Sequence, residues 1–225
     1  MTDVSYELHR MEGAKALVLT FGSFTNPGRS EPSYAFMQTC LRVQARKTVA
    51  FDVAYFKARE NDWYFSGIEG LGLDHSSAVS ALKSISQSYD RVICIGNSMG
   101  AYGTLVFGGA ISADAVLAFS PKTRSDAVFR ATISDKRWND AIAHLLKTCN
   151  SEAHSVSSMW ASLGAPRSAN VIVGGLDVRD QAYAEDVAGL PFVKVQIFAQ
   201  SGHDLVHSLR ESGVLDQMIL DSVVE

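Results

Sequence analysis

Short hydrophobic runs recur along the chain, and longer segments with helical periodicity separate them. The runs have the length of strands and lie at Ala16–Phe21, Thr48–Phe51, Val92–Ile95, Ala115–Phe119, Val171–Val173 and Val193–Phe198. In the segments between them, apolar residues recur three and four positions apart, as at Val79, Leu82 and Ile85, which places them on one face of a helix. Apolar strands that alternate with amphipathic helices are typical of a mostly parallel sheet covered on both faces. The pattern therefore predicts an α/β fold.

The alternation runs through the whole chain, so we expect residues 1–225 to form a single domain. The 225 residues are 47% hydrophobic, enough for one sizeable core, and no repeat, low-complexity tract or linker divides them. The longest interval between predicted strands, residues 122–169, carries apolar residues at nearly helical spacing: Trp138, Ile142, Leu145 and Leu146. Periodicity leaves two interpretations of this interval open, a small helical lid or ordinary helices that cover the sheet.

Charge and polarity exclude some classes of partner. The formal net charge is -4 and no segment concentrates Lys or Arg, so the chain lacks the basic surface that nucleic-acid binding requires. No charged residue occurs between Val92 and Ala113, but five glycines and several polar residues interrupt that stretch. A strand followed by a helix accounts for it better than a membrane span does.

The N-terminus and the cysteines indicate a reducing compartment. The first ten residues have neither the basic start nor the apolar stretch of a secretory signal, so we expect a cytoplasmic protein. The three cysteines, Cys40, Cys94 and Cys149, are odd in number and far apart, which indicates reduced thiols rather than a disulfide framework.

The strongest chemical signal is the sequence Gly96-Asn97-Ser98-Met99-Gly100, which fits G-x-S-x-G. It lies where a predicted strand ends and a helix should begin, the place at which a tight turn exposes a serine hydroxyl above a sheet. Glycines on either side suit a turn with strained backbone angles at the serine. The alternative is a plain turn in which the hydroxyl of Ser98 only caps the helix.

A serine hydroxyl needs a base that an acid orients before it can act as a nucleophile. His203 follows the last predicted strand, and Asp177 follows the strand before it, with Asp180 one helical turn later. The chain order Ser, Asp, His suits this architecture. We favour Asp177 over Asp180 as the acid because it comes first after the strand, where Gly174-Gly175 permits a sharp turn.

No metal or cofactor is expected. His203 and His207 have the spacing of an i, i+4 metal pair, but no Glu follows His203 and no third ligand is evident. The glycine-rich motifs that bind nucleotides after a strand are also missing, so a nucleotide-binding domain is not indicated.

Two backbone N–H groups should stabilise the oxyanion of an acyl-transfer intermediate. One is that of Met99, directly after Ser98 and at the N-terminus of the predicted helix. The other should come from the loop after the first parallel strand, where Gly22 allows close approach and Ser23 or Phe24 supplies the N–H.

With these residues in place, the chain resembles an α/β-hydrolase-fold serine hydrolase over essentially its whole length. Its "SMG-x-Y" elbow, its "FSP" strand end and an upstream "D…WY", here Asp52 with Trp63 and Tyr64, resemble a subgroup of small bacterial hydrolases. We associate that subgroup loosely with surface glycans. The chain departs from many relatives at the oxyanion loop, where Phe21-Gly22 replaces His-Gly.

The resemblance and the motifs together predict an enzyme. Ser98 would attack a carboxylic ester or thioester, His203 would move the proton and Asp177 would hold the imidazole, with a small-molecule or glycan-linked acyl group as substrate. Phe24, Trp63 and Tyr64 would either form a wall of the substrate site or close the sheet edge by packing. Two other functions stay open: an acyltransferase that uses the same acyl-enzyme, and a non-catalytic binding module that retains the fold.

Overall fold

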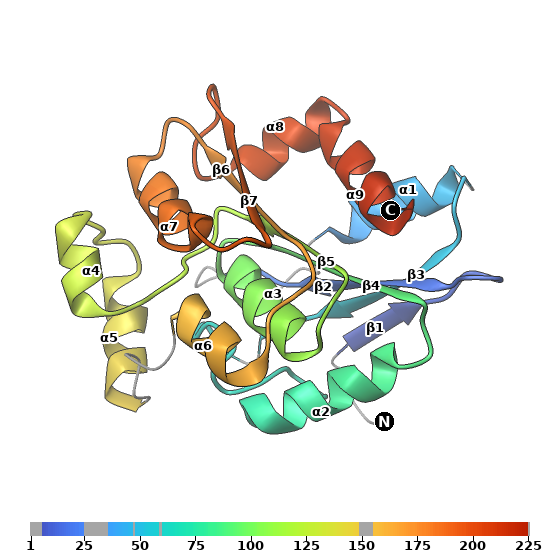
Figure 1. The fold of residues 1–225 in the computed structure, drawn as a ribbon, viewed down its shortest axis with the longest axis horizontal. Coiled ribbons are helices and arrows are strands. Elements are labelled where there is room, and N and C mark those ends of the chain that lie inside the picture. Colours follow the sequence, from blue (N-terminus) through green and yellow to red (C-terminus); the bar gives the residue numbers. More distant parts are fainter. Residues whose placement is uncertain (1–5, 25–35, 47, 59, 149–154, 225) are drawn as a thin grey trace.

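The computed structural model describes residues 6–24, 36–46, 48–58, 60–148 and 155–224. Within them, one seven-stranded sheet has the order β1-β3-β2-β4-β5-β6-β7 (Figure 1). Every neighbouring pair is parallel except β1 and β3, which are antiparallel. The strands are β1 (Tyr6–His9), β2 (Ala16–Phe21), β3 (Phe51–Phe56), β4 (Arg91–Asn97), β5 (Ala115–Phe119), β6 (Ala169–Gly174) and β7 (Val193–Phe198). The α/β class is confirmed.

Helices cover both faces of the sheet (Figure 1). They are α1 (Met37–Ala45), α2 (His75–Ser86), α3 (Met99–Ala110), α4 (Ala127–Thr132), α5 (Asn139–Thr148), α6 (Val156–Leu163), α7 (Val178–Ala188), α8 (Leu205–Glu211) and α9 (Val214–Val224). Successive side chains of a strand point to opposite faces, so Leu17 and Leu19 of β2 join the core under α2, α3, α6 and α7, whereas Val18 joins the core under α1, α8 and α9. Because the strands from β2 to β7 run parallel, their carboxyl ends lie at one edge of the sheet.

Two strands differ from the sequence-based expectation. The third strand spans Phe51–Phe56, not Thr48–Phe51, because the buried carboxylate of Asp52 is tolerated inside it. That carboxylate accepts hydrogen bonds from the Met11 N–H and the Tyr89 hydroxyl. The edge strand β1 was not expected, since its half-buried sequence YELH carries no continuous apolar run.

The described residues of the interval 122–169 form helices α4, α5 and α6, which have different surroundings. Helix α6 covers the sheet, and the indole N–H of Trp160 donates to the Leu105 carbonyl of α3 at 2.8 Å. Helices α4 and α5 lie beside the sheet, next to α6 and α7 (Figure 1). We call residues 122–148 the insert. That residues 122–169 form a lid stays a prediction.

The stretch from Val92 to Ala113 is strand β4 followed by α3, as its glycines and polar residues indicated. In the described part of the chain, no helix combines the length and the apolar character that crossing a bilayer would require. Cys40 and Cys94 are buried free thiols, and Cys149 lies outside the described residues.

Candidate active site

Ser98 occupies a strained turn between β4 and α3. Its φ of 54° and ψ of -119° lie in a region that residues with a side chain rarely adopt. The two glycines of the motif make the turn possible: a Cβ on Gly96 would lie 2.3 Å from the Gly100 carbonyl oxygen, and one on Gly100 would lie 2.2 Å from the Phe21 carbonyl oxygen. The hydroxyl of Ser98 makes no capping hydrogen bond to α3. A simple capping role does not account for it.

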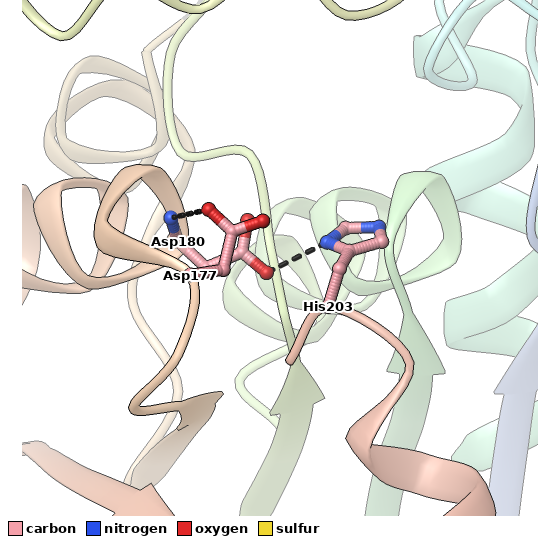
Figure 2. Close-up of side chains that lie close together, drawn as sticks. All are labelled: Asp177, Asp180 and His203. Carbon is pink, nitrogen blue, oxygen red and sulfur yellow. Dashed lines mark hydrogen bonds and ion pairs between the residues drawn. The ribbon is translucent and has the colours of Figure 1, made fainter. Parts of the chain in front are cut away.

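His203 lies between the hydroxyl of Ser98 and a carboxylate. The residue stands in the loop between β7 and α8, with its Nε2 3.1 Å from Ser98 Oγ. On the other side of the ring, Nδ1 lies 2.6 Å from Oδ2 of Asp180, the contact that Figure 2 marks by a dashed line. The side chain of His203 is 29% exposed and that of Asp180 is 1% exposed, so the ring lies between a buried carboxylate and the half-buried Ser98.

The carboxylate bound to Nδ1 of His203 belongs to Asp180 and not to Asp177, which the sequence favoured. Asp177 is the N-cap of α7, and its carboxylate accepts from the backbone N–H groups of Arg179 and Asp180 and from the guanidinium of Arg179. Helix capping therefore turns its carboxylate toward its own helix, as Figure 2 shows. Asp180, one turn into α7, faces His203 instead.

The environment keeps Asp177 ionised. Burial alone would raise the pKa of its carboxyl, but hydrogen bonds from the Arg179 side chain and the charge of Arg137 outweigh burial and lower it. Asp177 and Asp180 thus present two carboxylates to a common space beside the imidazole.

That space already holds a cation. Oxygen atoms of Asp177 and Asp180 and a ring nitrogen of His203 lie within 4.8 Å of one another, a set that could suit a metal ion. However, Nη1 of Arg137 is 3.3 Å from Asp177, 2.8 Å from Asp180 and 3.3 Å from His203 Nδ1. The guanidinium fills the position that a metal ion would need. Arg137 was not among the residues expected from the sequence.

The loop after β2 is fixed close to Ser98. The Ser23 hydroxyl donates to the carbonyl of Asn97, the residue before Ser98, at 2.8 Å. The buried hydroxyl of Tyr64 donates to the Gly22 carbonyl, also at 2.8 Å. Ser23 therefore lies beside the elbow where an oxyanion donor is needed, and Met99 begins α3 directly after Ser98. Tyr64 is 1% exposed, and its hydrogen bond to Gly22 stabilises this loop.

The rings of Phe24, Trp63 and Trp138 contact one another, and Trp138 also contacts the imidazole of His203. The centroids of Phe24 and Trp63 lie 6.1 Å apart, those of Trp63 and Trp138 6.1 Å, those of Phe24 and Trp138 6.2 Å, and those of Trp138 and His203 5.5 Å. Trp63 is 2% exposed, and Trp138 lies between it and the histidine in this cluster. The sequence pattern predicted only a helical position for Trp138, whose indole lies next to His203.

A cavity of about 480 Å³ lies along α3, with α2 and α6 on its flanks. Trp63, Tyr102 and Phe107 are among its mostly apolar lining residues, whereas neither Ser98 nor His203 lines it. Trp63 therefore lines this cavity and also contacts Trp138, the ring next to His203.

His207 and Asp52 lie outside this cluster. His207 lies on α8 and pairs with Glu211 at 3.3 Å, with both side chains mostly exposed. The carboxylate of Asp52 is occupied by its hydrogen bonds to Met11 and Tyr89.

Solved structures of known proteins have the same fold. The chain is similar to a capsule O-acetyltransferase of Neisseria meningitidis serogroup A (15% identity, TM-score 0.65), with 95% of this chain and 91% of that chain covered. It is also similar to FphF, a fluorophosphonate-binding serine hydrolase of Staphylococcus aureus (14% identity, TM-score 0.63), with 94% of this chain and 84% of that chain covered. A third similar structure is the Pyrococcus furiosus esterase Pf2001 (14% identity, TM-score 0.56), with 98% of this chain and 93% of that chain covered. No protein-family model and no curated protein matches the sequence. The likenesses confirm the α/β-hydrolase fold.

Proposed function

We propose that this chain of the α/β-hydrolase fold is a serine acyl hydrolase that cleaves a carboxylic ester or thioester. One observation carries the proposal: the imidazole of His203 lies between Ser98 Oγ at 3.1 Å and Asp180 Oδ2 at 2.6 Å. The strained elbow at Ser98 supports it, because backbone strain of this kind concentrates at functional sites. In the proposed triad, Asp180 replaces Asp177 as the acid.

The first half of the reaction forms the acyl-enzyme. Nε2 of His203 takes the proton of the Ser98 hydroxyl as Oγ attacks the acyl carbonyl carbon, and Nδ1–H stays bound to the carboxylate of Asp180. The carbonyl oxygen becomes an oxyanion facing the backbone N–H groups of Met99 and Ser23, each worth about 3 kcal/mol of barrier. The tetrahedral intermediate then collapses, His203 returns the proton to the leaving oxygen or sulfur, and the acyl group stays on Ser98.

The second half releases the acyl group. Water gives a proton to Nε2 of His203 as its oxygen attacks the ester carbonyl on Ser98, and a second collapse frees the carboxylic acid and restores the hydroxyl. The half-buried rings of Phe24 and Trp138 form the wall beside this chemistry, where they would contact an apolar acyl chain or stack on a sugar ring.

Transfer of the acyl group to an alcohol is the second candidate. It is supported by the similarity to the capsule O-acetyltransferase, which extends over 95% of this chain. The two functions share every step up to the acyl-enzyme and differ only in whether water or a sugar hydroxyl attacks it.

A panel of p-nitrophenyl esters from acetyl to octanoyl tests the proposal, with and without added mono- and disaccharides. Hydrolysis predicts p-nitrophenol and free acid in equal amounts, whereas transfer predicts acylated sugar at the expense of free acid. No turnover of any ester by the wild-type protein, and no difference between wild type and Ser98→Ala, would contradict both candidates.

A further inference from the structure

Arg137 touches the proposed triad from outside the elements that carry it. The residue belongs to the insert, between α4 and α5, and the mechanism derived above makes no use of it. Its Nη1 donates to Asp180 Oδ1 at 2.8 Å, on the oxygen that does not face His203. The carboxylate of Asp180 is therefore held at both ends, by Arg137 on one oxygen and by the imidazole on the other.

A second carboxylate fixes the guanidinium in place. Nε of Arg137 donates to Asp135 Oδ1 at 2.9 Å, and its Nη2 donates to Asp135 Oδ2 at 3.3 Å. This fork leaves Nη1 aimed at α7. The guanidinium also lies over the ring of Trp138, with its carbon 5.1 Å from the ring centroid. Arg137 therefore contacts both the carboxylates and the indole beside His203.

Asp135 is in turn anchored to α7. Its side chain is fully buried, and its Oδ2 accepts from the Lys122 ammonium at 3.0 Å and from the Tyr183 hydroxyl at 2.8 Å. Burial would raise the pKa of Asp135, but Arg137 and Lys122 overcome this and hold it well below its usual range. Arg130 completes the anchor by donating to the carbonyls of Asp135 and Arg137. The loop between α4 and α5 is thus tied down on both sides.

Carboxylates and cations alternate in this cluster beside the imidazole. Lys122, Arg137 and Arg179 each contact at least one of the carboxylates of Asp135, Asp177 and Asp180. Without Arg137, the neighbouring carboxylates of Asp177 and Asp180 would repel each other, and Asp180 would lose the hydrogen bond to its Oδ1.

The orientation of the Asp180 carboxylate matters to the base. Its Oδ2 lies 2.6 Å from Nδ1, and a carboxylate turned away would leave the ring without the partner that fixes its tautomer. The guanidinium bound to the other oxygen, Oδ1, limits that rotation.

We infer that Arg137 is a positioning residue of the proposed triad, which holds the Asp180 carboxylate aimed at His203 and so makes the insert part of the active site. The inference rests on the proposed function. It accounts for a guanidinium within hydrogen-bond range of both Asp180 and His203, which packing alone does not require.

Three variants test the role, measured as kcat, KM and the pH profile of kcat/KM on the best ester of the panel. Arg137→Gln removes the charge, and Arg137→Lys keeps a charge but cannot bind Asp135 through two nitrogens. Arg179→Gln is the matched control. Arg179 binds Asp177 from the more exposed side and contacts neither Asp180 nor His203 through its side chain. Circular dichroism and urea denaturation verify that each variant folds.

Arg137→Gln should lower kcat about 10- to 100-fold with KM nearly unchanged, the range typical of groups that orient a reacting residue. The charged groups in contact with His203 are Asp180 of α7 and Arg137 of the insert, and Asp177 lies just beyond them. Loss of the positive charge favours the imidazolium, so the midpoint of the kcat/KM profile should move to higher pH by about half a unit or more. Arg137→Lys should show a smaller change in both quantities.

Two failures can be told apart. If wild type hydrolyses esters but Arg137→Gln and Arg179→Gln lose kcat equally and share the wild-type midpoint, the positioning role is wrong while the proposed function stands. If Arg137→Gln does not fold, a wild-type kcat and midpoint in Arg137→Lys would overturn the role. If wild type turns over no ester at all, the proposed function fails and the inference fails with it.

Discussion

His203 and Asp180 meet through a 2.6 Å contact between ring Nδ1 and carboxylate Oδ2, although 23 residues separate them along the chain. A distance this short between two potential acceptors requires a proton between them. With that proton on the ring, the other ring nitrogen presents its lone pair to the hydroxyl of Ser98. The acid of the proposed triad is therefore Asp180, in the first turn of α7, and not Asp177, the N-cap of that helix.

The two aspartates should respond very differently to amidation. Asp180→Asn should lower kcat by about 10³- to 10⁴-fold, because the amide cannot stabilise the imidazolium and favours the wrong tautomer. Asp177→Asn keeps a capping oxygen for α7 and should cost less than about tenfold. Steady-state kinetics on one ester compares them, and equal losses, or a larger loss at Asp177, would return the acid role to Asp177.

The elbow should not accept a side chain at Gly100. A Cβ there would lie 2.2 Å from the Phe21 carbonyl oxygen, so Gly100→Ala must push α3 and the oxyanion loop apart. We expect kcat/KM to fall at least about 100-fold, since a small misplacement of reacting groups is costly. Gly189→Ala is the control, because nothing lies within 4 Å of a Cβ at that position. Wild-type kcat/KM in Gly100→Ala would contradict the close approach.

Trp63 should matter first for stability. Its side chain is 2% exposed and packs on Phe24 and Trp138, so Trp63→Ala should lower the free energy of unfolding by about 3–5 kcal/mol. Leu73→Ala, at a position 75% exposed, should change it by less than about 0.5 kcal/mol. Urea denaturation measures both. A loss below about 1 kcal/mol at Trp63 would mean that its ring is not part of the core.

The ion pairs between α1 and α9 should give a pH-dependent contribution to stability. The buried carboxylate of Asp216 binds Arg42 and Arg46, and the hydrogen bonds from Arg42 hold its pKa below the usual value. A lowered folded-state pKa contributes stability above the unfolded pKa of about 3.9 that disappears as the pH falls through the folded value. Both guanidinium groups reach solvent, so Asp216→Asn should cost only about 1–2 kcal/mol at pH 7.

Urea denaturation of wild type and Asp216→Asn at pH 7 and pH 3 follows this contribution. The difference between the two proteins should shrink at pH 3, because this pH lies below the unfolded pKa of about 3.9 and the carboxyl of Asp216 takes up a proton in the unfolded chain. A difference that is the same at both pH values would show that the charge of Asp216 does not stabilise the fold.

Sequence pattern sufficed for the sheet because its central strands are continuous apolar runs. It failed where a polar residue is satisfied by distant partners: the carboxylate of Asp52 breaks the run of β3, but Met11 and Tyr89 compensate its burial. The half-buried edge strand β1 carries too little pattern to be recognised. Local pattern reports burial, and it does not report which groups meet in space.

The same limit explains the errors at the site. The elbow and His203 carry local signals, a glycine-flanked serine and a histidine directly after a strand. The choice between Asp177 and Asp180 depends on which carboxylate caps α7, and a shift of one helical turn decides it. Arg137 and Trp138 lie in a segment with no motif, and only the packing of the insert against α7 brings them to the triad.

Labelling with a fluorophosphonate probe tests the central claim most directly, because the probe reacts only with a serine that a base has activated. Wild type and Ser98→Ala, each verified as folded, are incubated with the probe, and peptide mass spectrometry locates the adduct. We expect one adduct per chain on the peptide that contains Ser98, and none in Ser98→Ala. An unlabelled wild-type protein would contradict Ser98 as the nucleophile and favour a binding module that retains the fold. An adduct that persists in Ser98→Ala would also contradict this role and would place the nucleophile at another residue.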